Sequence, residues 1–226
     1  ITADKVNVLS TQDTDITPFD TGAYASRQTY VSGMAVKKTG AIFKEKILDY
    51  AAYMLEKPQD TLDVRDNHIV DKETGTQLLP MEELATTAFY SLDRSVHITA
   101  EATSHCKTNT FATGACFAEV EVDMPLGKVK VTNIVNVHDS GKLINPKLAA
   151  ARVHGGMSMG LGYGLSEELL FDAKGRPLND NLLDYKLPTA MDTPDLNALF
   201  VELDDPTGPF GNKALGEPPA IPVAPA

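Results

Sequence analysis

One segment of the sequence combines a helical pattern with a high density of glycine. Asn145 and Pro146 mark the start of a helix, because Asn is favoured as an N-cap and Pro in the first turn. The helix is expected to run toward Leu170, and ten consecutive residues within it contain Gly155, Gly156, Gly160, Gly162 and Gly164. Each glycine costs a helix interior about 1 kcal/mol relative to alanine. Two explanations for this cost stay open: tight packing against another part of the chain, with methionine filling gaps, or close approach of a ligand.

The other hydrophobic patterns predict helices and strands in an irregular order. A long helix is expected over residues 24–57, with Gly33 and Gly40 as candidate interruptions, and a shorter helix over 80–90. Alternating apolar and polar residues predict strands at 6–9, 96–99, 118–123 and 128–138. Strands are also predicted at 62–64 and 68–70, which flank residues 65–67 like a hairpin, and at 182–187 and 199–203. Because strands and helices do not alternate regularly, we expect an α+β fold of mixed sheets packed with two long helices. Two α+β subdomains are expected, over about 1–110 and 111–226.

Charge and cysteine content exclude several classes of protein. The 226 residues include 20 Lys and Arg against 31 Asp and Glu, a formal net charge of −11. Such an acidic chain does not suit a nucleic-acid backbone or an anionic membrane as its main partner. No stretch approaches the roughly 18 apolar residues that span a bilayer, so a soluble protein is expected. Cys106 and Cys116 are too few for a disulfide framework, which favours a cytoplasmic location with both thiols buried.

Both ends of the sequence indicate that it continues beyond them. The chain starts at Ile1 without a Met, and residues 220–226 form an apolar run with no polar tail. We therefore expect the chain to be a fragment of a longer polypeptide.

A loop rich in small residues leads into the long predicted helix over residues 21–29. The first N–H groups of a helix have no partner within it, and the helix dipole makes this end partly positive. Gly22 and Ala25 allow close approach, and Arg27 adds a positive charge. The loop is therefore a candidate seat for an anionic or strongly hydrogen-bonding ligand. The alternative is that Gly22 and Ser26 only cap the helix.

A single carboxylate, Glu217, lies between Gly216 and the pair Pro218-Pro219. Proline restricts the backbone, so this loop is stiff and suits a general base that must be held still beside a substrate. A solvated glutamate without a catalytic role is the alternative.

Other polar residues point to no further chemistry. Neighbouring residues of a strand face opposite sides, so His138, Asp139 and Ser140 do not make a hydrolytic triad. No metal site is expected, because metal-ligand spacing is absent among His68, His97, His105, His138 and His154. The acidic cluster Asp13, Asp15 and Asp20 lacks the further ligands of a calcium loop.

Three blocks of sequence together resemble the molybdenum-binding subunit of the xanthine dehydrogenase family, the molybdenum hydroxylases. They are 13–27 (DTDITPFDTGAYASR), 139–162 (DSGKLINPKLAAARVHGGMSMGLG) and 216–219 (GEPP). The blocks match in order and separation, and the resemblance covers essentially the whole chain as most of the second half of that subunit. Bacterial xanthine dehydrogenases are the nearest in pattern.

The resemblance implies a molybdopterin-binding domain and roles for particular residues. The residues that would bind the pterin and its molybdenum head are Gly22, Ala23, Tyr24, Ala25, Ser26, Arg27, Gln28 and Met159. Ala25 would lie beside the substrate, Glu217 would be the general base, and water would supply the oxygen. Many relatives have a cofactor-contacting Gln where Met159 stands, and a Met side chain cannot donate a hydrogen bond. Arg152 also stands where Gln is common.

The same resemblance implies a substrate, cofactors and partners. A purine such as xanthine or hypoxanthine is the first expectation, and a nicotinate-like heteroaromatic or an aldehyde is the alternative within the family. The cofactor would be molybdenum-molybdopterin, with its cytosine dinucleotide form as one option. Iron-sulfur clusters and FAD would be carried by partner subunits or domains, and the fragment alone would be inactive. A non-catalytic scaffold or binding module is the alternative from another class.

Overall fold

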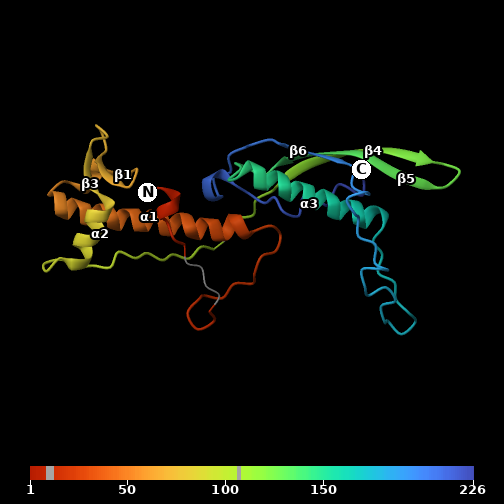
Figure 1. Ribbon diagram of the computed structural model, residues 1–226, viewed down its shortest axis with the longest axis horizontal. Helices are drawn as coiled ribbons and strands as arrows, with labels where there is room; N and C mark the ends of the chain where they lie inside the picture. The colour runs from red at the N-terminus through yellow and green to blue at the C-terminus, as the bar shows by residue number, and fades with distance from the viewer. Residues whose placement is uncertain (9–12, 106–107) are drawn as a thin grey trace. The chain divides into compact units, whose positions relative to one another are not determined.

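The computed structural model describes residues 1–8, 13–105 and 108–226, and they form two compact units (Figure 1). The first unit comprises 1–22 and 35–104, and the second comprises 23–34 and 105–226. Helix α1 (Gln28–Leu55) contributes residues 28–34 to the second unit and the rest of its length to the first. That each half forms a separate subdomain, with a boundary near residue 110, stays a prediction.

The first unit packs helices against a small antiparallel sheet. Its sheet has the order β1 (Leu62–Arg65), β2 (His68–Asp71) and β3 (Gln77–Pro80), followed by α2 (Met81–Tyr90). Two 3-10 turns, η1 (Ala3–Lys5) and η2 (Gln59–Thr61), complete it. Apolar side chains of α1, the sheet and α2 form its core, namely Ile47, Tyr50, Ala51, Leu62, Ile69, Leu79, Leu84 and Ala88.

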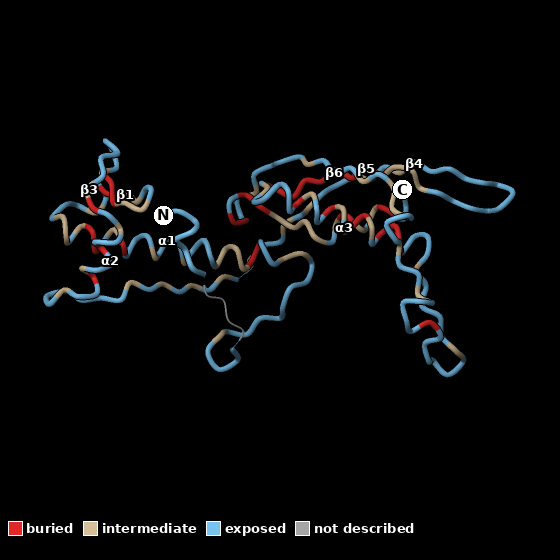
Figure 2. The backbone as a smooth tube through the Cα atoms, viewed as in Figure 1, coloured by how far each residue is buried: buried red, intermediate tan, exposed pale blue. Residues whose placement is uncertain are grey.

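The second unit is built on a mixed sheet covered by one helix. Its strands are β4 (Thr113–Asp123), β5 (Lys128–Asp139) and β6 (Asp195–Phe200), in the order β4-β5-β6. The β4 and β5 strands pair antiparallel, whereas β5 and β6 pair parallel. Helix α3 (Pro146–Leu165) covers the sheet, and the core between them contains Ile134, Val153, Met157, Leu161 and Val223. Figure 2 shows buried stretches in red along α3 and the neighbouring strands.

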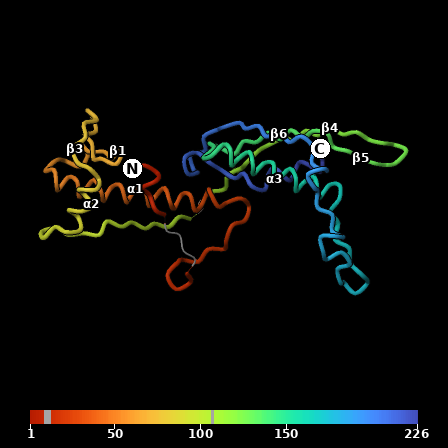
Figure 3. The backbone as a smooth tube through the Cα atoms, viewed as in Figure 1, coloured from red at the N-terminus to blue at the C-terminus, as the bar shows by residue number. Residues whose placement is uncertain are grey.

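Parallel pairing of β5 and β6 requires a crossover, which α3 supplies (Figure 3). The chain leaves β5, passes through residues 140–145 and enters α3 at the predicted cap. The Asn145 Oδ1 atom accepts the N–H of Leu148 at 3.1 Å, and Pro146 occupies the first turn, so the predicted start of this helix is confirmed. A short 3-10 turn, η3 (Pro209–Gly211), lies in the loop after β6.

The structure explains the glycines of α3 by packing within the chain. An added Cβ at Gly156 would lie 2.7 Å from Pro219 Cβ, and one at Gly160 would lie 2.6 Å from the carbonyl oxygen of Ala220. At both positions the C-terminal segment approaches so closely that only glycine fits. Of the two explanations left open by the sequence, close approach of another stretch of backbone therefore holds for these glycines.

Three predicted strands are wrong, because local hydrogen bonds replace strand pairing. Residues 3–5 form η1 and 6–8 are irregular, while Leu9 lies outside the described residues. In the predicted strand 96–99, the Val96 N–H bonds to the Ala88 carbonyl of α2 at 2.7 Å. Residues 182–184 form a turn, in which Asn181 Oδ1 accepts the backbone N–H groups of Leu183 and Asp184, and 186–187 have no regular structure.

Other boundaries also differ from the sequence patterns. Helix α1 begins at Gln28 rather than near residue 24, and it runs unbroken through Gly33 and Gly40. Strand β3 was not predicted. It has only four residues, and the last of them, Pro80, was assigned to the start of the helix that follows. No described helix is long and apolar enough to cross a membrane. Cys116 is only half-buried, not fully buried as expected, and burial raises its pKa; Cys106 lies outside the described residues.

Candidate functional site

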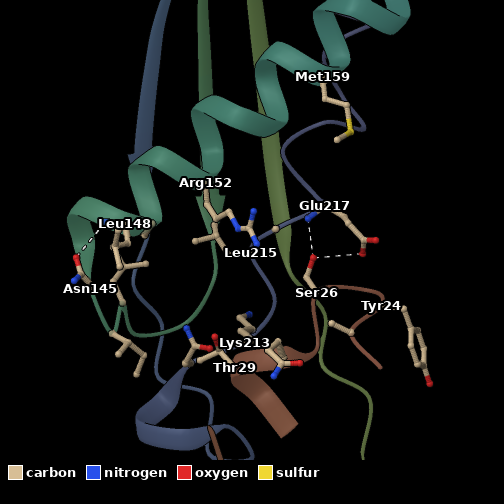
Figure 4. Close-up of a pocket in the computed structure, with 17 residues that line it drawn as sticks. Tyr24, Ser26, Thr29, Asn145, Leu148, Arg152, Met159, Lys213, Leu215 and Glu217 are labelled. Atoms are coloured by element: carbon tan, nitrogen blue, oxygen red, sulfur yellow. Dashed lines mark hydrogen bonds between the residues drawn. The ribbon is translucent and has the colours of Figure 1, made fainter. Parts of the chain in front are cut away.

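A pocket of about 500 Å³ opens in the second unit, between the start of α1, one face of α3 and the loop 212–217 (Figure 4). Six of the residues predicted from sequence line it: Ala23, Tyr24, Ser26, Gln28, Met159 and Glu217. Its volume lies within the usual range for small-molecule and cofactor sites. Residues that are 194 positions apart in the chain, from 23 to 217, thus meet at one cavity.

Three predicted site residues do not line this pocket. Gly22 belongs to the first unit, where it is exposed and has a φ of +88°. Ala25 is exposed beside the pocket. Arg27 turns onto its neighbour Tyr24: its Nη1 donates to the Tyr24 hydroxyl at 3.0 Å, and its guanidinium carbon lies 4.9 Å from the ring centroid.

Ser26 holds Glu217 through two hydrogen bonds. The Ser26 hydroxyl oxygen accepts the backbone N–H of Glu217 at 2.7 Å, and the same hydroxyl donates to Glu217 Oε2 at 3.4 Å. Figure 4 shows both bonds between the loop before α1 and the loop that carries Glu217. The Glu217 side chain remains exposed to solvent and lines the pocket. Ser26 therefore does more than cap a helix.

The backbone that presents Ser26 has an uncommon conformation. Ala25 and Ser26 both adopt positive φ angles, 49° and 56°, in the left-handed region. That region costs a residue with a Cβ about 1 kcal/mol or more, so the surrounding contacts must stabilise it. This conformation was not predicted from the sequence, because neither residue is a glycine or an asparagine.

A buried ion pair anchors the Glu217 loop at its N-terminal side. The Lys213 ammonium lies 2.7 Å from Asp139 Oδ2, and both side chains are 11% exposed. Lys213 Nζ also donates to the carbonyl of Phe111 at 2.9 Å. Burial raises the pKa of the Asp139 carboxyl, but Lys213 and the Gly141 N–H outweigh it and hold this pKa below its ordinary value. Sequence reasoning missed the pair, because 74 residues separate its members.

Two residues that depart from the family pattern also lie at the pocket. Met159 and Arg152 project from α3, as Figure 4 shows, and both line the cavity. Met159 contributes a thioether to the pocket lining, and Arg152 contributes a permanent positive charge. Asn145, which caps α3, and Asn212 are further polar lining residues that the sequence did not single out as site residues.

Behind the pocket loops, three polar side chains of β5 and its end are fully buried. Asn136, His138 and Ser140 occupy every second position of the chain, and each is at most 1% exposed. Neither ring nitrogen of His138 has a hydrogen-bond partner among the described residues. Burial without a partner disfavours the charged imidazolium, which lowers the pKa of His138 below its ordinary value of 6.5.

We expect His138 to make the protein less stable in mild acid. Its folded-state pKa is lowered, so as the pH falls from 7 toward 5 the unfolded chain gains a proton that the folded chain does not, and stability decreases. One proton gives a slope of at most about 1.4 kcal/mol per pH unit. Urea unfolding of wild type and His138→Gln between pH 5 and 7 measures the slope. An equal slope in both proteins would contradict the expectation.

Comparison with known proteins identifies the family. The sequence matches the molybdopterin cofactor-binding domain over residues 1–194, and the chain therefore belongs to this family. It is 48% identical over 223 residues to the xanthine dehydrogenase molybdenum-binding subunit of Escherichia coli O157:H7, covering 98% of this chain and 30% of that protein. It is 33% identical over 226 residues to the probable hypoxanthine oxidase XdhD of Escherichia coli K12, covering 98% and 23%.

The solved structures agree with this assignment. Quinoline 2-oxidoreductase from Pseudomonas putida 86 superposes with a TM-score of 0.83 at 27% identity, over 93% of this chain and 28% of that one. These comparisons confirm the α+β fold and the resemblance to the xanthine dehydrogenase family. The chain spans less than a third of the length of each of these relatives.

Proposed function

We propose that this chain forms part of the molybdenum site of a hydroxylase that oxidises a purine such as xanthine or hypoxanthine, with Glu217 as the general base. One observation carries the proposal: Ser26 fixes the Glu217 carboxylate at the edge of a pocket of about 500 Å³. A base held by neighbouring groups is correctly placed before the substrate arrives, which is what proton transfer in a transition state requires.

The residues of the pocket fit a polar, anionic cofactor such as molybdopterin. The first N–H groups of α1 have no acceptor within the helix, and Gln28 and Arg152 add side-chain donors. Asn212, which also lines the pocket, has a buried Oδ1 without a partner among the described residues. Ala23, Tyr24, Ser26 and Gln28 would therefore hold the pterin, and Met159 would contact it through its thioether; the parts assigned to Gly22, Ala25 and Arg27 stay predictions.

The chemistry divides between the cofactor and the chain. When bound, molybdopterin carries a molybdenum centre that accepts the two electrons removed from the substrate. As general base, Glu217 would accept a proton from the water-derived oxygen that enters the product. The proton would go to Oε1, because Oε2 already receives the hydrogen bond from Ser26. Ser26 keeps the carboxylate in place during this transfer, and water supplies the oxygen that enters the product.

A purine is the substrate class that the relatives favour. The curated relatives at 48% and 33% identity are named for xanthine and hypoxanthine chemistry. A second candidate is another heteroaromatic ring of the nicotinate type, and the structural match to quinoline 2-oxidoreductase favours it. An aldehyde remains the third member of the substrate panel.

The complete enzyme would need more than this chain. Because the chain spans less than a third of its relatives' length, we propose that it works as part of a longer molybdenum-binding subunit. Iron-sulfur clusters and FAD on partner subunits or domains would carry the electrons away. The cytosine dinucleotide form of molybdopterin is an option, and the isolated 226-residue chain would show no turnover.

The proposal is tested with the complete molybdenum-binding subunit and its partners. Elemental analysis is expected to find close to one molybdenum per subunit, and xanthine and hypoxanthine are expected to be oxidised faster than nicotinate or an aldehyde. In water labelled with oxygen-18, the label should enter the product. If no molybdenum binds, the chain is a scaffold or binding module instead; if nicotinate is the best substrate, the second candidate replaces the purine.

A further inference from the structure

Three glycines of α3 form a groove that receives the C-terminal segment of the chain. Gly156, Gly160 and Gly164 recur every four residues, so they lie on one face of the helix. An added Cβ would lie 2.7 Å from Pro219 at Gly156, 2.6 Å from Ala220 O at Gly160, and 3.3 Å from Ala224 at Gly164. We call these three positions the glycine groove.

Asn136 holds the same segment from the side of the sheet. Its side chain is completely buried on β5, and its Nδ2 donates to the carbonyl of Pro219 at 2.9 Å. Pro219 is itself fully buried, against Gly156. A backbone carbonyl two residues beyond Glu217 is thus held between a helix and a strand.

We infer that the glycine groove and Asn136 are positioning elements for the Glu217 carboxylate, an inference that rests on the proposed function of Glu217. Pro218 and Pro219 follow Glu217 directly and restrict the backbone between it and the groove. A shift of Pro219 or Ala220 is therefore transmitted to the carboxylate. Ordinary contact begins at 3.4 Å, so a Cβ at Gly160, 2.6 Å from Ala220 O, would require a shift of about 0.8 Å. A misplacement of about 1 Å at a reacting group can lower a rate about 100-fold.

The test compares Gly160→Ala with Gly155→Ala in the complete holoenzyme. Gly155 is on the same helix, but a Cβ there meets nothing within 4 Å, so this variant keeps wild-type kinetics. For Gly160→Ala, kcat per bound molybdenum should fall about 100-fold while KM stays within about twofold. Gly164→Ala, with its 3.3 Å contact, should fall between the two.

A double variant separates positioning from general damage to the fold. In a Glu217→Gln background, Gly160→Ala should lower kcat by less than about threefold, because the base that it displaces is already absent. If the two losses multiply, or if Gly160→Ala alone keeps wild-type kcat, the inference is wrong. If Glu217→Gln keeps wild-type kcat, the proposed function itself fails.

A second variant covers the case in which Gly160→Ala does not fold. Asn136→Ala removes the hydrogen bond to Pro219 without adding volume, and it should lower kcat per molybdenum about tenfold at unchanged KM. Wild-type kcat in a folded Asn136→Ala enzyme would overturn the inference, because the segment would then keep Glu217 in place without this hydrogen bond.

Discussion

Glu217→Gln in the complete enzyme should lower kcat about 1,000-fold. A glutamine amide has the shape of the carboxylate but cannot accept the proton, and a positioned general base contributes roughly 100-fold to 10,000-fold. The backbone N–H of Glu217 still bonds to Ser26, so the loop should keep its place and the molybdenum content should match wild type. Steady-state kinetics with xanthine, normalised to bound molybdenum, measures the loss.

The matched control for this variant is Glu168→Gln. Glu168 is also exposed and belongs to the same unit, but it does not line the pocket, so its removal should leave kcat unchanged. A Glu217→Gln enzyme with kcat within about threefold of wild type would refute the base assignment and favour a non-catalytic role for this loop.

Lys213→Met should destabilise the protein by about 3–5 kcal/mol, the usual cost of removing one partner of a buried ion pair. The ammonium is 2.7 Å from Asp139, and neither side chain is more than 11% exposed. Its loss leaves the Asp139 carboxylate buried with the Gly141 N–H as a remaining donor. Urea unfolding at pH 7, followed by circular dichroism, gives the change in the free energy of unfolding.

Arg176→Met provides the comparison for Lys213→Met within the same unit. Arg176 and Asp172 are also 2.7 Å apart, but their side chains are 74% and 21% exposed. Because water screens this pair, its loss should cost less than about 1 kcal/mol. Similar losses in the free energy of unfolding for the two substitutions would show that burial does not increase the cost of removing Lys213.

Local signals in the sequence predicted the elements whose structure depends on neighbouring residues. Asn145 and Pro146 define the start of α3 through capping and the fixed φ of proline, and the structure has that cap. The predicted strands at 96–99 and 182–187 are wrong because local hydrogen bonds compete with strand pairing. Backbone N–H groups of these segments bond to the Ala88 carbonyl of α2 and to Asn181 Oδ1 rather than to a neighbouring strand.

The site was predictable only where a motif carried it. The loop 21–29 and Glu217 stood out by composition, and the structure brings Ser26 of that loop to Glu217. Asn136 and Lys213 gave no local signal, because each acts through a partner more than 70 residues away. Local patterns in a single sequence do not indicate which distant residues come into contact in the fold.

The left-handed backbone at Ala25 and Ser26 has a consequence for natural variation. Branched side chains such as Val or Ile crowd the carbonyl in that conformation, whereas Gly, Asn or Asp adopt it readily. Small residues at these two positions across related sequences would therefore reflect a steric filter on the main chain. This restriction on the main chain is independent of the ligand, so it would exclude bulky side chains from the turn even in relatives whose pockets bind other substrates.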